Sequence, residues 1–171
     1  VAIGVNALED NTTANNNTAV GRYALRVNTT GASNVAVGRG ALQANTTASY
    51  NTVVGDSAAD ALTTGAQNTV VGYNAFTSAT TAAYSVAMGY RALLNITTAN
   101  YNTAVGYDSM KDTTTGANNT ALGGKSLEKN TTADNNTAVG YAALLENTTG
   151  ADNTSVGAYS LDVNTTGDNN C

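Results

Sequence analysis

The chain is poor in the residues on which most active sites depend. It has no histidine, no tryptophan and a single cysteine, Cys171, at its last position. One cysteine excludes an internal disulfide framework and a cysteine cluster for metal. Without histidine and tryptophan, the commonest general base and the usual platform for stacking sugars are both missing.

Charged side chains are also scarce. Seven Lys and Arg against twelve Asp and Glu give a net charge of −5 over 171 residues. The basic residues are scattered, and this balance argues against a nucleic-acid-binding surface. Aromatic residues form 6% and charged residues 11% of the chain. These are too few large side chains for a conventional core and too few charges for a disordered tail.

Long apolar runs are absent as well. No run could span a bilayer, and no basic segment followed by an apolar one opens the chain, so we predict no membrane insertion. The chain starts at Val1, inside a repeat and without an initiator Met. Residues 1–171 are therefore interpreted as a single repeat domain that forms a segment of a longer fibre.

What the chain does contain is one short unit, repeated throughout. A glycine recurs every 17 residues without insertion, and ten copies of the unit fill the chain. Such regularity is the signature of a solenoid, in which each unit meets the next in the same way. The recurring glycines are Gly4, Gly21, Gly38, Gly55, Gly72, Gly89, Gly106, Gly123, Gly140 and Gly157.

Each copy has the same order of side chains. A run such as Asn136 to Val139 precedes the glycine, an Ala-Leu pair or a close variant follows it, and two threonines come next in all ten copies. β-Branched residues, Gly and Asn at fixed places, with no 3.6-residue stripe, favour short strands over helices. We predict an all-β fold, a parallel β-solenoid of ten 17-residue coils. Stacked at about 4.8 Å per coil, it would be about 48 Å long.

Two fixed positions have predicted structural roles. The recurring glycine should supply a backbone angle or a close approach that a Cβ would block. The column four residues before this glycine is asparagine at nine of its ten positions, Asn170 included, with Ser85 as the exception. We predict that this asparagine occupies left-handed bends and that its amides hydrogen-bond from coil to coil. Ligand binding by these amides is the less favoured alternative.

Two adjacent apolar residues precede nine of the ten recurring glycines, as Ala104 and Val105 do before Gly106. Neighbours in a strand point to opposite faces, so one residue fills the interior and the other needs a partner. The first of the two is mostly alanine, which lets a partner backbone come close. We therefore predict that the alanines face a symmetry mate in a bundle of identical chains around an axis. A monomer with a kinked strand is the alternative.

The combined motif resembles a known kind of repeat. Asn-Thr-Ala-Val-Gly-Tyr-x-Ala-Leu followed by Asn-Thr-Thr-Gly, best preserved at Asn136 to Gly150, is similar to repeats of bacteriophage tail-fibre shafts. More distantly, Val1 to Gly4 resemble the Val-Ala-Ile-Gly motif in the head repeats of trimeric autotransporter adhesins. The resemblance implies a homotrimeric β-solenoid fibre shaft that is extracellular, on a cell surface or on a virion. It further implies receptor binding through domains outside residues 1–171.

We accordingly predict a structural fibre or filament shaft that displays attachment domains. Its expected partners are copies of itself, in a homotrimer, an end-to-end filament or both. An open solenoid exposes unpaired strand edges at its ends, and such edges template further pairing. The chain should therefore continue into further sequence or polymerise end to end, with Cys171 at the junction.

Two other binding functions are kept as alternatives. Threonine ladders on a β-solenoid suggest ice binding, but adjacent threonines in a strand point opposite ways and do not form a two-column face. Nine tyrosines fall in three places of the repeat. They suggest either an adhesin surface that binds glycans or, as we prefer, stacked rings that seal the edge of the rod.

Catalysis is the third class. Acids such as Asp134 and Asp152 lie on adjacent coils, and carboxylates about 5 Å apart serve retaining glycoside hydrolysis. The chain offers no non-repetitive loop in which to build a pocket around them. We predict no enzymatic activity, no catalytic, cofactor-binding or metal-binding residue, and no cofactor.

Asn-x-Ser/Thr sequons occur eleven times because the repeat places Asn before threonines. A match to this acceptor motif is by itself weak support for glycosylation. The sequon asparagines are Asn11, Asn16, Asn28, Asn45, Asn95, Asn118, Asn130, Asn135, Asn147, Asn153 and Asn164.

Overall fold

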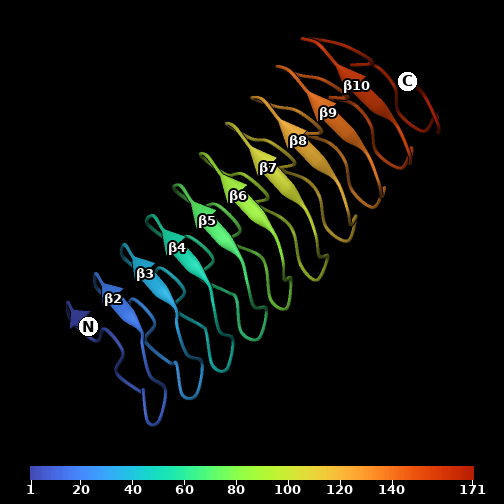
Figure 1. Ribbon diagram of the computed structural model, residues 1–171. Helices are drawn as coiled ribbons and strands as arrows, with labels where there is room; N and C mark the ends of the chain where they lie inside the picture. The colour runs from blue at the N-terminus through green and yellow to red at the C-terminus, as the bar shows by residue number, and fades with distance from the viewer.

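The computed structural model describes all of residues 1–171 as one stack of coils without a helix (Figure 1). Each coil contributes one short strand, and the ten strands form a parallel sheet in chain order. The predicted all-β parallel solenoid is confirmed. The strands are β1 (Ala2–Ile3), β2 (Thr18–Val20), β3 (Val35–Val37), β4 (Thr52–Val54), β5 (Thr69–Val71), β6 (Val86–Met88), β7 (Thr103–Val105), β8 (Thr120–Leu122), β9 (Thr137–Val139) and β10 (Thr154–Val156).

The register of the sheet follows the repeat without a slip. Between β7 and β8, for example, Ala104 pairs with Ala121 and Val105 with Leu122, each 17 residues apart. The same spacing holds in every other strand pair, so equivalent residues form columns parallel to the axis. Figure 1 shows the outcome: the coils follow one another in order, with the N- and C-termini at opposite ends.

The interior is a thin core of small and medium side chains. It consists of 27 buried apolar residues, drawn mainly from the middle residue of each strand and from the Ala-Leu pair. The leucine column has an unusual backbone, since Leu25 has a φ of 50° and Phe76, in the same column, a φ of 60°. This left-handed region is unfavourable for bulky residues. Complete burial of these side chains offsets the strain.

Buried asparagines connect the coils. The backbone N–H of Asn34 donates to Oδ1 of Asn17 at 2.8 Å, while Nδ2 of Asn34 donates to the carbonyl of Ala48 at 2.8 Å. The expected amide hydrogen bonds between coils are thus confirmed, but the expected left-handed bend at this asparagine is wrong. The positive φ belongs to the residue immediately before it, such as Tyr50 or Tyr101. Turning the chain one residue earlier lets the amide enter the interior, where its donors and acceptors are satisfied.

A second buried column, at the residue before the threonine pair, is less uniform. Nδ2 of Asn45 donates to Oδ1 of Asn28 at 2.6 Å, and Asn147 donates to Asn130 at 3.3 Å. Between these two stretches the interior column contains other residues, and Oδ1 of Asn45 has no hydrogen-bond partner. The four intervening residues are Leu62, Ala79, Ile96 and Thr113.

The recurring glycine meets both predicted requirements. Gly89 has a φ of 139°, and a Cβ built on it would overlap the carbonyl oxygen of Gly106 in the next coil. Gly124, which is outside this column, has only the ring of Tyr141 as its near neighbour, at 3.3 Å from such a Cβ. The contact between glycine backbones therefore sets how closely consecutive coils stack.

Gly89→Val should destabilise the stack, because the new side chain collides with backbone and forces a strained φ. We expect a loss of about 3 kcal/mol or more in the free energy of unfolding. Gly124→Val is the matched control, since Val5 already occupies that column and little change is expected. Thermal unfolding followed by circular dichroism measures both variants. Equal melting temperatures for the two would contradict the role of the glycine column.

Candidate functional surface on the outside of the solenoid

The two apolar columns of the strand are oriented opposite to our prediction. Ala104 is fully buried, whereas Val105 is 36% exposed. The expectation that the alanine column faces a symmetry mate is therefore wrong. Because the leucine column already fills most of the narrow interior, the position beside it is mostly alanine and at most valine, as at Val53 and Val70. The outward position holds Val, Met, Leu or Ile.

The outer surface of the sheet has a simple composition, and we call it the strand face. It consists of the first and third residues of β2 to β10. The first residue is always Thr or Val, and the third is always aliphatic. No strand contains a charged residue. The third residues are Val20, Val37, Val54, Val71, Met88, Val105, Leu122, Val139 and Val156, all of them partly or well exposed.

Five of the nine tyrosines form the predicted parallel stacks, while Tyr141 and Tyr159 meet edge to face. Tyr90 lies between Tyr73 and Tyr107, with ring centroids 5.6 and 5.4 Å apart and nearly parallel planes. Tyr84 and Tyr101 stack at 4.9 Å in the column before the buried asparagine. Each inner ring face is covered by the next tyrosine, so these rings present mainly their edges and hydroxyls to solvent. A sugar that stacks on an aromatic ring needs an open ring face.

The two threonines of each pair differ in their surroundings. The hydroxyl of the first donates to the carbonyl of its equivalent in the next coil, as Thr46 does to Thr63 at 3.2 Å. The second threonine, such as Thr47 or Thr64, is exposed in every coil. The predicted structural ladder is therefore present at the first position. The pair contributes one well-exposed threonine column.

Ion pairs join neighbouring coils rather than forming a site. Arg91 and Asp108 approach to 2.6 Å, and Lys129 and Glu146 to 2.7 Å, each pair 17 residues apart. The hydrogen bond that Arg91 donates to Asp108 raises the pKa of the Arg91 guanidinium, although burial opposes the shift. The Asp108 side chain is only 3% exposed, so this pair holds a buried carboxylate.

The two acids considered for catalysis have separate surroundings. The carboxylate of Asp134 accepts a hydrogen bond from the N–H of Ala117 at 2.7 Å, which ties it to the preceding coil. Asp152 is exposed on the next coil, and its N–H donates to the backbone carbonyl of Asp134 at 3.2 Å. Neither acid lines a cavity. Asp168 makes the same bond to Ala151 as Asp134 makes to Ala117, which indicates a structural use of this position.

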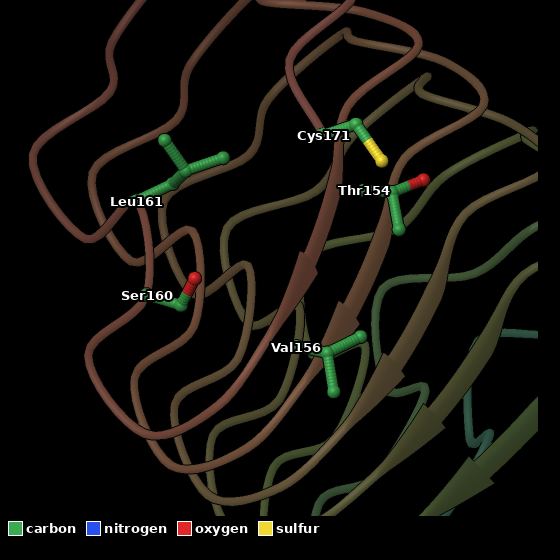
Figure 2. A pocket seen from close by; sticks show the side chains of 5 residues that line it. All are labelled: Thr154, Val156, Ser160, Leu161 and Cys171. Carbon is green, nitrogen blue, oxygen red and sulfur yellow. The ribbon is translucent and has the colours of Figure 1, made fainter.

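One depression of about 410 Å³ lies at the C-terminal end of the stack, where Figure 2 shows its lining side chains. It is formed by the last strand and the last turn of the chain, and it includes the exposed free thiol of Cys171. This is the end surface of the final coil and not a cleft between elements. The lining residues are Thr154, Val156, Ser160, Leu161 and Cys171.

Burial separates the eleven sequons into groups. Three of their asparagines, Asn16, Asn118 and Asn135, are exposed. Three more are half-buried, and the remaining five are buried and inaccessible to a glycan in the folded chain. The buried asparagines are Asn28, Asn45, Asn130, Asn147 and Asn153.

No group of three or more His, Cys, Asp or Glu side chains comes together in a geometry that could hold a metal ion. The chain forms no helix with the length and apolarity needed to cross a membrane. No protein-family model, curated protein or solved structure matches the sequence. The likeness to fibre repeats therefore stays a prediction from the motif.

Asp60 is a half-buried carboxylate without an ion-pair partner, so its charge should lower the stability of the coil. Burial raises the pKa of its carboxyl above the ordinary value, so the ionised form at pH 7 disfavours the folded state. Asp60→Asn should raise the melting temperature at pH 7, by less than about 2 °C. The gain should vanish at a pH below the folded pKa, where the carboxyl is already neutral. Asp152→Asn, at an exposed acid, is the control and should leave the melting temperature unchanged at both pH values. A gain that is independent of pH would contradict this explanation.

Proposed function

We propose that the chain is a structural fibre shaft. The observation that carries the proposal is the uninterrupted stacking of ten strands in one register, with no insertion from Ala2 to Val156. A shaft needs the same cross-section along its length, and a constant repeat provides it. Insertions, which commonly carry binding loops in other folds, are absent from every coil.

Hydrogen bonds along the axis account for the stiffness that a shaft requires. The chain makes 110 backbone hydrogen bonds, and only 17 of them lie within the strands. Many of the others also connect consecutive coils, as when the N–H of Leu25 donates to the carbonyl of Ala41 at 3.1 Å. Coil contacts are therefore distributed around the whole cross-section, which resists bending in every direction.

The two faces of a coil along the rod axis have complementary hydrogen-bond donors and acceptors. Leu42 donates its N–H to Ala58 in the following coil, while Gly55 donates its N–H to Val37 in the preceding coil. Every inner coil repeats this arrangement of donors and acceptors. Such a stack can be extended by further coils without a change of geometry, which supports the proposed end-to-end association.

The proposal includes the location and partners that the motif implies. The shaft belongs to a virion, a cell surface or an extracellular fibre. It associates with copies of itself, binds its receptor through other domains, and does no chemistry of its own. The uncharged strand face and the lack of a cleft along the coils support this division of labour.

A shaft should be modular. Deleting residues 86–119, two whole repeats, joins Ser85 to Thr120 in the normal order. The rod should shorten by about 9.6 Å while its cross-section stays the same, as measured by small-angle X-ray scattering. Deleting residues 86–118 leaves one extra residue in the joined coil. That control should melt at a lower temperature, because the extra residue breaks the ladder of hydrogen bonds. A changed cross-section in the two-repeat deletion would contradict a modular shaft.

The location can be tested on the native source. Antibodies against residues 1–171, applied to intact particles or cells, should label thin fibres in electron micrographs. A labelled layer close to the surface, with no projecting fibres, or labelling only after lysis would overturn the proposed function. Antibodies preincubated with the purified chain are the control for specificity.

A further inference from the structure

We infer that the strand face is the surface on which a second copy of this chain docks, side by side along the rod. The inference rests on the proposed function, because lateral association is one way in which a thin coil becomes a fibre. It assigns the contact to the column of Val54, Met88 and Val105, and not to the alanine column inside the coil.

The first argument compares the columns within the chain. Other outer positions vary from copy to copy; the residue after the recurring glycine, for example, is Arg39, Asp56 or Tyr73 in successive copies. The third residue of the strand is also partly or well exposed, yet it is aliphatic in every copy. Ile3 is 59% exposed and Met88 is 40% exposed. An exposed position that stays apolar in all ten copies indicates a surface that is covered in the assembled protein.

The second argument concerns charge. The strand face has no ionisable group from β1 to β10, whereas charged residues occur elsewhere around the coil. Depletion of charge with retention of aliphatic and aromatic residues is typical of the centre of a protein interface. The stacked rings of Tyr73, Tyr90 and Tyr107 come two residues after the aliphatic column and border it along the middle coils.

The third argument identifies the partner. The aliphatic side chains follow one another at the strand spacing, about 4.8 Å, for about 48 Å. A partner that fills the gaps between them along this whole length must have the same axial repeat. A second copy of the chain has it by construction. A globular partner of unrelated structure would meet only a few of the ridges.

The available area is sufficient for such a contact. A strand of three residues is about 10 Å wide, so the strand face covers about 480 Å² on each copy. A pair of copies would bury about 1,000 Å² from the strands alone, which is where specific interfaces begin. The bordering tyrosines increase this area.

The test introduces charge on the strand face and, separately, elsewhere on the same two coils. Met88→Glu with Leu122→Glu places two carboxylates in the aliphatic column, two coils apart. Thr98→Glu with Thr132→Glu places the same charges in the exposed threonine column and is the matched control. Sedimentation or light scattering of each purified chain gives its mass relative to the 17.2 kDa monomer.

We expect the wild type and the threonine variant to form side-by-side oligomers, and the Met88/Leu122 variant to show the cross-section of a single chain in small-angle X-ray scattering. Circular dichroism checks that all three are folded. If the Met88/Leu122 variant does not fold, Val71→Thr with Val105→Thr replaces it, since threonine has the shape of valine and already occurs in these strands. That change should weaken association about tenfold.

The results distinguish this inference from the proposed shaft. A wild-type chain that is a folded monomer at all concentrations would overturn the docking surface and the proposed self-association, but not the modular shaft, which the two-repeat deletion tests. Association that is lost equally in the threonine variant, or unaffected in both strand-face variants, would also overturn it. Failure of the proposed shaft would instead appear in the labelling of the native source, whatever the oligomeric state.

Discussion

The structure depends on the close contact between the glycine backbones of consecutive coils. Gly89 can approach Gly106 because neither has a Cβ, and the φ of 139° directs the chain into the next turn. With that contact set, strands, threonines and asparagines of adjacent coils come within hydrogen-bond distance together. Every other interaction between coils therefore has to recur with the same period of 17 residues as the glycine contact.

Much of the fold could be predicted because repetition makes each position visible ten times. The parallel sheet, the glycine column, the stacked tyrosines and the amide bonds between coils all followed from the repeat. The orientation of Ala104 and Val105 did not. Alternation shows that neighbours face opposite ways, but only the space left by the leucine column decides which of the two is inside. The positive φ of Leu25 carried no sequence signal at all, since bulky residues are rare in that region.

The correction changes which surface is available for association. An alanine seam would have allowed two backbones to approach closely but offered little apolar area. The valine column offers more area and a series of side chains that can interdigitate. Whichever of the two adjacent apolar residues points outward, it leaves an apolar column on the surface of the coil. Because Ala104 is buried, Val105 is the residue that such a partner would meet.

The interrupted asparagine column has a consequence for folding. Nearly identical coils could pair with the wrong neighbour, displaced by one whole repeat, and keep almost all backbone hydrogen bonds. Such a displacement would place Asn45 or Asn130 against residues that differ from their native neighbours, and it would separate Arg91 from Asp108. The departures from perfect repetition therefore favour the native pairing of each coil over a pairing displaced by one repeat. A consensus version built from ten identical units would lose this identification and would be free to misalign by one coil.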